Sequence, residues 1–259
     1  MARFKDMVVL ITGAAGGFGL KLAERFAAEG ARLVLSDLEA ARLDEAAAKL
    51  GSGLGAETAT LAGDVADEKL SQDLVALALS RFGRLDVAVN NAGIVHDVMK
   101  LPQTPSDIAR RVFEIDLLGM FFAMKHQIPA LERQYKETAL PGAIVNIASV
   151  AGIAGAPKLA VYAAAKHGVV GLTRSAAAEC ATKGVRINAV CPSFARTAMV
   201  TGMIGNDNPA GEAELTRGVP MRRLAETDEI AEVVLFAADP KNSFMTGQTL
   251  AADGGITAI

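Results

Sequence analysis

The 259-residue chain has no tryptophan, and only two tyrosines, two cysteines and three histidines. The cysteines, Cys180 and Cys191, and the histidines are scattered without the spacing of metal ligands, so we expect no metal site. Two cysteines in a chain of this length indicate reduced, buried thiols rather than a disulfide framework. The formal net charge is −3 and no basic block occurs, so nothing favours nucleic acid as a partner.

The sequence also lacks a long apolar run. No stretch reaches the roughly 18 uncharged apolar residues of a membrane span, so we expect no membrane association. Residues 1–6 do not have the pattern of a signal peptide and lead directly into a strand pattern, which favours a cytoplasmic protein. No linker, composition shift or internal repeat divides the chain, so we expect a single domain over residues 1–259.

Small and branched aliphatic residues are abundant instead: 51% of the chain is hydrophobic although only 5% is aromatic. Short apolar runs alternate with segments of helical periodicity. Strands are expected at residues 7–11, 31–36, 58–62, 85–89, 143–148, 185–190 and 248–252. Helices are expected at residues 18–29, 39–50, 69–82, 106–135, around Tyr162 as far as residue 183, and 227–238. This alternation predicts an α/β fold, a Rossmann-like single domain with a doubly wound parallel sheet.

The least regular segment is residues 193–223, which are rich in Gly, Met, Asn and Pro. A long irregular stretch within a compact domain is often a lid or a binding loop. We therefore expect a substrate lid here, with a mobile surface excursion as the alternative.

A glycine-rich turn follows the first strand pattern. Gly13, Gly17 and Gly19 form G-x-x-x-G-x-G between this strand and the first helix. Glycines let a backbone approach a pyrophosphate closely, and a helix that starts near Phe18 offers its N-terminal N–H groups to the same anion. The position of the turn between strand and helix indicates a dinucleotide site.

Asp37 ends the second strand pattern, about 20 residues after the glycine turn. An acidic side chain there binds the adenosine ribose hydroxyls of NAD and repels the extra phosphate of NADP, so we expect NAD as the cofactor. No Lys or Arg lies within the turn or directly after Asp37, and Arg42 is expected to face solvent. The alternative role for Asp37 is a helix cap. Asp64, after the third strand, is placed to accept a hydrogen bond from the adenine amino group.

Three further residues have the chemistry of proton transfer. Ser149 closes the fifth strand pattern, and Lys166 follows Tyr162 by four positions on a predicted helix. Residues at i and i+4 share one helix face, and a nearby ammonium favours the phenolate form of a tyrosine. Such a tyrosine can act as an acid or a base near neutral pH. Taken alone, Tyr162 could also be a core residue.

In this order, the residues resemble the pattern of the short-chain dehydrogenase/reductase family, in the subtype with TGxxxGxG and YxxxK motifs. The resemblance covers nearly the whole chain. The matching pieces are residues 12–19, Asp64, residues 90–93, Ser149, Tyr162, Lys166, residues 191–192, Thr197 and residues 253–255.

The resemblance implies a role for each residue. Ser149 would hydrogen-bond the substrate oxygen, Tyr162 would remove or return the alcohol proton, and Lys166 would favour ionised Tyr162 and bind the nicotinamide ribose. Thr197 would hold the nicotinamide carboxamide. The hydride itself is the cofactor's chemistry. The expected cofactor-binding residues are Thr12, Gly13, Gly17, Phe18, Gly19, Asp37, Leu38, Asp64, Val65, Asn91, Ala92, Gly93, Tyr162, Lys166, Pro192 and Thr197.

Two residues depart from the family pattern. Asp116 stands where the family usually has an asparagine, which is thought to hold a water that links the active lysine to solvent. We count Asp116 as a fourth catalytic residue beside Ser149, Tyr162 and Lys166, in a proton relay altered by its charge. Ser193 follows Pro192 where the family commonly has glycine, which predicts a different entry into the next loop.

The resemblance implies an NAD-dependent dehydrogenase that interconverts a secondary alcohol and its ketone. Residues expected near the substrate are mostly apolar, which favours a hydrophobic or cyclic alcohol, with His96 at the rim: His96, Met99, Val150, Phe194, Met199, Met203 and Met221. One alternative is a 3-oxoacyl-thioester reductase, against which Asp37 counts because those enzymes usually use NADPH. Another is a non-catalytic nucleotide-binding regulator, against which the intact Ser149, Tyr162 and Lys166 count.

The family commonly forms homotetramers, so a homotetramer is expected here too. The apolar C-terminal residues 251–259 are expected to pack against a neighbouring subunit. Packing within their own chain is the alternative.

Overall fold

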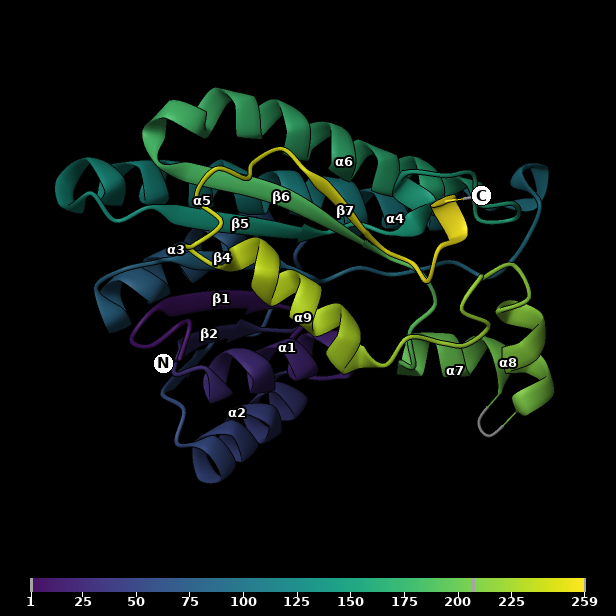
Figure 1. Ribbon diagram of the computed structural model, residues 1–259, viewed down its shortest axis with the longest axis horizontal. Coiled ribbons are helices and arrows are strands. Elements are labelled where there is room, and N and C mark those ends of the chain that lie inside the picture. The colour runs from purple at the N-terminus through teal and green to yellow at the C-terminus, as the bar shows by residue number, and fades with distance from the viewer. Residues whose placement is uncertain (1, 206–207, 259) are drawn as a thin grey trace.

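The computed structural model describes residues 2–205 and 208–258, except the side chains of Ala198, Met199 and Met203. All seven strands described are parallel and form one sheet in the order β3-β2-β1-β4-β5-β6-β7 (Figure 1). The strands are β1 (Val8–Thr12), β2 (Arg32–Ser36), β3 (Thr58–Thr60), β4 (Val87–Asn90), β5 (Gly142–Ile147), β6 (Val185–Pro192) and β7 (Thr249–Ala252).

Helices connect the strands and cover both faces of the sheet. They are α1 (Gly17–Ala28), α2 (Ala40–Leu54), α3 (Glu68–Phe82), α4 (Ser106–Phe113), α5 (Gly119–Thr138), α6 (Ala160–Cys180), α7 (Ala198–Ile204), α8 (Pro209–Leu215) and α9 (Thr227–Ala238). Shorter turns are η1 (Leu101–Gln103), η2 (Glu114–Leu118), η3 (Val150–Gly152), η4 (Ala181–Lys183) and η5 (Ile256–Ala258). No helix in the described ranges is long and apolar enough to cross a bilayer.

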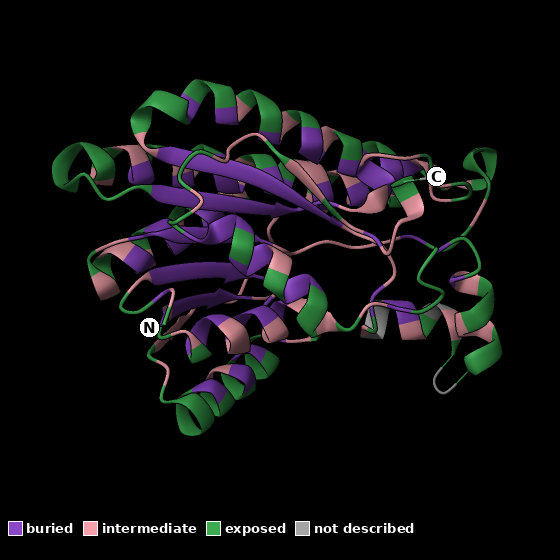
Figure 2. Ribbon diagram, in the orientation of Figure 1, coloured by how far each residue is buried: buried purple, intermediate pink, exposed green. Residues whose placement is uncertain are grey.

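The sheet separates two hydrophobic cores. Side chains of α1, α2 and α9 pack on one face, and those of α3, α5 and α6 pack on the other (Figure 1). Because both faces are covered, the central strands are continuous aliphatic runs, and the five residues of β1 are all buried (Figure 2). Each fully buried Leu, Ile or Val stabilises the fold by about 1.5–3 kcal/mol.

The strand order places a crevice between β1 and β4. From β1 the chain proceeds outward through β2 and β3, and then returns to β4 on the other side of β1. The connections after β1 and β4 therefore leave in opposite directions, and ligands of doubly wound folds bind at this switch point. The glycine turn follows β1, and residues 91–93 follow β4, so both border the crevice.

The expected elements are confirmed with two differences. The long helix expected at residues 106–135 is interrupted by η2, a π-helical turn between α4 and α5. Residues 193–223 contain α7 and α8, which lie beyond the carboxyl ends of the strands (Figure 1). Both helices begin at side-chain caps: Thr197 Oγ1 accepts from Val200 N–H and Asn208 Oδ1 accepts from Gly211 N–H. Each spans seven residues, too short for helical periodicity to stand out.

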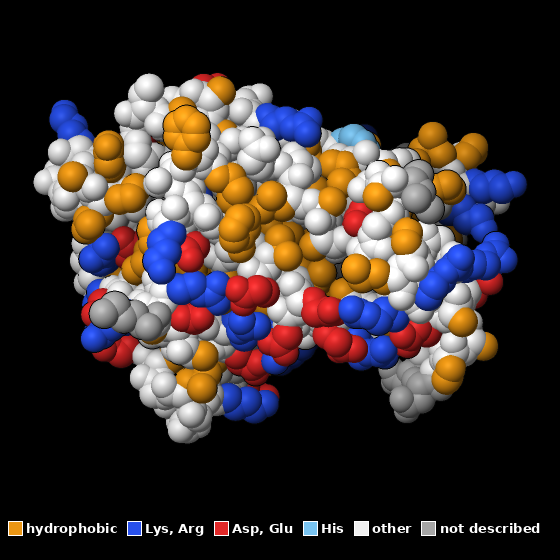
Figure 3. All heavy atoms as spheres, in the orientation of Figure 1, with side chains coloured by type: hydrophobic (Ala, Val, Ile, Leu, Met, Phe, Trp, Pro, Cys, Tyr) orange, Lys and Arg blue, Asp and Glu red, His pale blue; other side chains and the backbone are white. Residues whose placement is uncertain are grey.

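Ion pairs connect α9 to the N-terminal part of the chain. Arg25 of α1 pairs with Asp228 and Glu232 of α9, at 3.2 and 2.6 Å, and Arg3 also pairs with Glu232. Figure 3 shows acidic and basic side chains intermixed over α1 and α9. The carboxylates of these pairs are 50–56% exposed, so solvent screens the pairs and each contributes little to the free energy of unfolding.

Arg186 of β6 links α9 to the sheet more strongly than these ion pairs do, because it is only 8% exposed. Its guanidinium donates hydrogen bonds to the carbonyls of Ala237, Ala238 and Asp239 at the end of α9, and to that of Met245, at 3.0–3.3 Å. The last carbonyls of a helix have no partner within the helix. Arg186 therefore completes the C-terminus of α9 and joins it to the sheet.

We expect Arg186→Met to lower the free energy of unfolding by about 2–4 kcal/mol, because several buried carbonyls lose a charged donor. Urea denaturation followed by circular dichroism measures this. Arg217→Met is the matched control: Arg217 has a side chain that is 76% exposed, and its replacement should change stability by less than about 0.5 kcal/mol. Equal stability losses in the two variants would contradict a special role for Arg186.

Candidate active site

A cleft of about 550 Å³ opens at the switch point. It brings together every residue expected to bind the cofactor except Thr12, along with Ser149. Its other lining residues are Gly16, Glu39, Arg42, Gly63, Ile94, Arg111, Ile115, Ile147, Ala148, Ser193, Ala195, Val200 and Ile230.

The glycine turn has the geometry of an anion site. Gly13 and Gly17 have φ of +68° and +51°, and a Cβ on Gly19 would lie 1.9 Å from the carbonyl oxygen of Gly13. Side chains are therefore excluded at Gly13 and Gly19, whereas a Cβ on Gly17 would point into open space. The start of α1 has no side-chain cap and no acidic residue in its first turn. Its first N–H groups remain available, so the turn fits a dinucleotide pyrophosphate.

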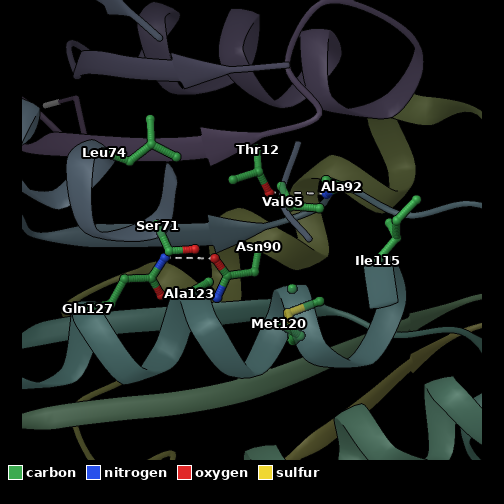
Figure 4. Close-up of a pocket in the computed structure, with 11 residues that line it drawn as sticks. Thr12, Val65, Ser71, Leu74, Asn90, Ala92, Ile115, Met120, Ala123 and Gln127 are labelled. Carbon is green, nitrogen blue, oxygen red and sulfur yellow. Dashed lines mark hydrogen bonds between the residues drawn. The ribbon is translucent and has the colours of Figure 1, made fainter. Parts of the chain in front are cut away.

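Thr12 holds the glycine turn through hydrogen bonds and does not line the cleft. Thr12 is buried, and its Oγ1 accepts hydrogen bonds from the N–H groups of Asn91 and Ala92, both at 3.1 Å. Figure 4 shows the bond from Ala92. The Asn91 amide donates in return to the carbonyls of Thr12 and Gly13, at 3.0 and 3.2 Å. These hydrogen bonds join the ends of β1 and β4, and the contact of Thr12 with the cofactor stays a prediction.

A second polar network lies beneath the end of β4, beside a cavity of about 10 Å³ (Figure 4). The amides of Asn90 and Gln127 exchange two hydrogen bonds, at 2.8 and 3.0 Å, and Asn90 also donates to Asn146 at 2.9 Å. These side chains are buried and satisfied, which favours a single arrangement. The network therefore gives residues 91–93 a rigid support.

Asp37 lines the cleft beside the glycine turn. Its two carboxylate oxygens accept from the N–H groups of Ala15 and Leu38, at 2.8 and 2.7 Å. Arg42 is exposed as expected, but it also lines the cleft, and its Nη2 lies 2.8 Å from the position of a Cβ on Gly16. The Arg42 guanidinium therefore lies close to the glycine turn. The residues of the turn itself do not indicate a nearby cation.

Asp64 also lines the cleft, and it is paired with a residue that the sequence did not indicate. It accepts from Ala66 N–H at 2.9 Å and forms an ion pair with Arg111 of α4. Burial raises the pKa of Asp64, but the Ala66 N–H and the Arg111 guanidinium outweigh this, so the pKa is lowered overall. Arg111 stands in a separate helix, so only the folded topology identifies it as part of the site.

The proton-transfer residues meet on the other side of the cleft. Tyr162 and Lys166 lie on the first two turns of α6, and Lys166 Nζ is 5.5 Å from the centroid of the Tyr162 ring. Ser149 follows β5, and its Oγ accepts from Ala151 N–H at 3.1 Å. This bond leaves the Ser149 O–H free to donate to a ligand oxygen.

Lys166 is held by two oxygens and is only 3% exposed. Its Nζ donates to the carbonyl of Ile147 at 3.2 Å and lies 3.4 Å from Asp116 Oδ2. Burial lowers the pKa of Lys166, but the charges of Asp116 and Tyr162 outweigh it and raise the pKa overall. Burial raises the pKa of Asp116, and the Lys166 charge reverses only part of that rise.

Asp116 sits within the π-helical turn η2, a feature frequent at functional sites. It is fully buried and does not line the cleft. It lies behind Gly93, where an added Cβ would come within 3.2 Å of Lys166 Nζ and 3.4 Å of Asp116 Oδ1. Gly93 and Lys166 thus line the cleft, whereas Asp116 lies behind them.

The substrate side differs from expectation. His96 is 6% exposed and buried, so its expected place at the rim is wrong. Of the residues expected near the substrate, those with described side chains lie outside the lining: His96, Met99, Val150, Phe194 and Met221. The side chains of Met199 and Met203 lie outside the described part of the chain. The larger apolar side chains that line the cleft are Phe18, Leu38, Val65, Ile94, Ile115, Ile147, Val200 and Ile230.

Comparison with known proteins is consistent with this site. A family model described as Enoyl-(Acyl carrier protein) reductase matches residues 13–257. The chain is 40% identical to the trans-4-hydroxycyclohexanecarboxylate dehydrogenase of Sinomonas cyclohexanicum, over 99% of this chain and 95% of that one. It is 38% identical to the cyclohexanol dehydrogenase of an Acinetobacter strain, over 99% and 97%. The crystal structure of carveol dehydrogenase from Mycobacterium avium in complex with NAD superimposes with a TM-score of 0.93, at 29% identity and with full coverage of both chains.

Proposed function

This chain belongs to the short-chain dehydrogenase/reductase family, and we propose that it is an NAD-dependent enzyme that interconverts a cyclic secondary alcohol and its ketone. One observation carries this proposal. Tyr162, Lys166 and Ser149 open into the same cleft as the glycine turn and Asp37. An acid–base tyrosine and a dinucleotide site thus face each other across one cavity.

In the oxidative direction, the Ser149 O–H donates a hydrogen bond to the alcohol oxygen and holds it beside Tyr162. Ionised Tyr162 then takes the hydroxyl proton as a general base, and in reduction it returns that proton to the forming alkoxide. The Lys166 ammonium favours the ionised form of Tyr162. Bound NAD supplies the hydride acceptor and NADH the donor, while the chain provides placement and electrostatics.

We infer that Asp37 sets the choice between cofactors. The wild-type kcat/KM should be at least tenfold higher with NAD(H) than with NADP(H), about 1.4 kcal/mol, because a phosphate on the ribose would meet the Asp37 carboxylate. Asp37→Ala should narrow this ratio, since the nearby Arg42 then faces the phosphate without an acidic competitor. Steady-state kinetics with both cofactors measures the ratio, and Asp44→Ala, an exposed carboxylate on α2, is the control. Equal or better kcat/KM with NADP(H) in the wild-type enzyme would contradict the assignment.

We propose a cyclic alcohol as the substrate because the cleft offers an apolar wall and because the two relatives above act on cyclohexane rings by name. Residues 193–223 would form the lid over it, since Ser193, Thr197 and Val200 line the cleft. NADH formation should be fastest with cyclohexanol and its ring-substituted derivatives, compared with open-chain secondary alcohols. A panel that includes a 3-oxoacyl thioester with NADH tests this. A preference for the thioester would favour the acyl reductase alternative.

We further propose a cytoplasmic homotetramer. Cys180 and Cys191 are both buried free thiols, which suits a reducing compartment. Phe236 and Phe244 are exposed near the sheet edge formed by β7, and hydrophobic side chains gather between β7 and α9 in Figure 3. Exposed apolar patches of this kind mark contact surfaces. Light scattering after size-exclusion chromatography tests the subunit number.

A further inference from the structure

We propose that Asp116 is a positioning residue that forms a buried ion pair with Lys166 and thereby raises the pH at which the Lys166–Tyr162 pair releases its first proton. This inference deepens the proposed function, since it rests on Tyr162 as the acid–base group. It concerns this chain's own carboxylate, in the place where the family pattern has a neutral amide.

The geometry gives Asp116 a defined set of partners. Oδ1 accepts from Ile94 N–H at 2.8 Å, which fixes the orientation of the carboxylate. Oδ2 has no hydrogen bond within the described residues, and its charge partner is Lys166 Nζ at 3.4 Å. Both side chains are almost completely buried, 0% and 4% exposed, so solvent screens their attraction little.

Few other titratable groups face Lys166. The titratable groups that face Lys166 are Asp116 from η2, Tyr162 from α6 and Cys191 from β6. Burial raises the pKa of the Cys191 thiol to about 11, so Cys191 is neutral at physiological pH. The other polar partner of Lys166 among the described residues is the uncharged carbonyl of Ile147. The charged groups at this point are therefore the Lys166 ammonium and the buried Asp116 carboxylate, with the Tyr162 ring beside the ammonium.

The negative charge of Asp116 disfavours the loss of a proton from Lys166 and Tyr162. Alcohol oxidation requires the Lys166–Tyr162 pair to have lost one proton from its fully protonated state, so that the tyrosine is ionised and the lysine is charged. Because the two groups are coupled, the release of this proton belongs to the pair. A negative charge a few ångströms away disfavours the release whichever group supplies the proton. In Asp116→Asn this charge is gone, while an amide oxygen can still accept from Ile94 N–H.

We therefore expect Asp116→Asn to move the acidic limb of the pH dependence of kcat/KM for alcohol oxidation to lower pH, by at least about one unit. Asp116→Glu keeps the charge and should retain a limb near that of the wild type. Asp228→Asn is the control, because it removes a carboxylate that is 56% exposed on α9 and should leave the limb in place. Asp116→Ser is a second neutral variant, to be used if Asp116→Asn does not fold.

A second readout does not depend on turnover. The chain has two tyrosines and no tryptophan, so Tyr135→Phe leaves Tyr162 as the only tyrosine. In this background, the alkaline rise in absorbance at roughly 295 nm reports ionisation of Tyr162 alone in the free enzyme. We expect the rise to occur at lower pH when Asp116→Asn is added.

The two readouts separate failure of this inference from failure of the proposed function. A tyrosinate transition at lower pH in Asp116→Asn, but not in Asp228→Asn, supports the inference even if no alcohol in the panel is oxidised. A transition that stays in place, or moves to higher pH, overturns it even if alcohol oxidation is fast. An acidic limb that moves equally in Asp228→Asn also overturns it, because the effect would then come from overall charge.

Discussion

Tyr162→Phe is expected to reduce kcat by at least about 10³-fold, some 4 kcal/mol of barrier, while NADH binding persists. The change removes only the phenolic hydroxyl, which is the group that exchanges a proton with the substrate oxygen. The half-buried ring of Tyr162 remains over Lys166, so the fold and the nucleotide end of the cleft should be unaffected. Steady-state turnover gives kcat, and the fluorescence of bound NADH gives the dissociation constant.

Tyr135→Phe is the matched control for this substitution. Tyr135 lies in α5 and is 37% exposed, away from the cleft lining. The control should retain wild-type turnover. Substantial activity in Tyr162→Phe would mean that another group performs the acid–base step.

Lys166→Met is expected to lower kcat/KM by at least about 10²-fold and to weaken NADH binding. The thioether keeps much of the lysine stem but cannot favour ionised Tyr162 or donate to a nicotinamide ribose. It also leaves the buried Asp116 without its cation, and breaking a buried ion pair from one side costs about 3–5 kcal/mol. Urea denaturation should therefore show a less stable protein.

The double variant Lys166→Met/Asp116→Asn separates these effects. It removes both charges, so it should recover most of the lost stability while its turnover stays low. If the double variant is no more stable than Lys166→Met, then Asp116 and Lys166 do not interact as the 3.4 Å separation indicates.

The sequence predicts most of the fold because its signals are local. Buried parallel strands require continuous apolar runs, and glycines end α2 and α3 in the left-handed conformation, so the predicted boundaries lie within a few residues of those observed. The π-helical turn η2 is absent from the prediction because an inserted residue hardly changes the helical periodicity. The short helices α7 and α8 depend on single capping side chains rather than on a pattern.

In the candidate site, too, the residues with local sequence signals were the ones predicted. Residues that act through backbone geometry or fixed spacing, such as Gly17, Tyr162 and Lys166, were predicted and lie around the cleft. Arg111 was missed because its long side chain reaches the cleft from α4, whose approach depends on the tertiary fold. Arg42 is exposed as predicted, and its place in the cleft lining was not predicted for the same reason. The direct contact between Asp116 and Lys166 likewise depends on packing between η2 and α6, which spacing along the chain does not specify.

Transfer of deuterium from an alcohol carbon to NAD is the defining step of the proposed reaction. Cyclohexanol deuterated at the carbinol carbon is incubated with NAD and the wild-type enzyme, and NADH is analysed by mass spectrometry and NMR. We expect cyclohexanone and NADH in equal amounts, with the deuterium at C4 of the nicotinamide ring, and loss of both products in Tyr162→Phe. Tight binding of NADH without deuterium transfer from cyclohexanol or any other alcohol of the panel would contradict the proposed reaction.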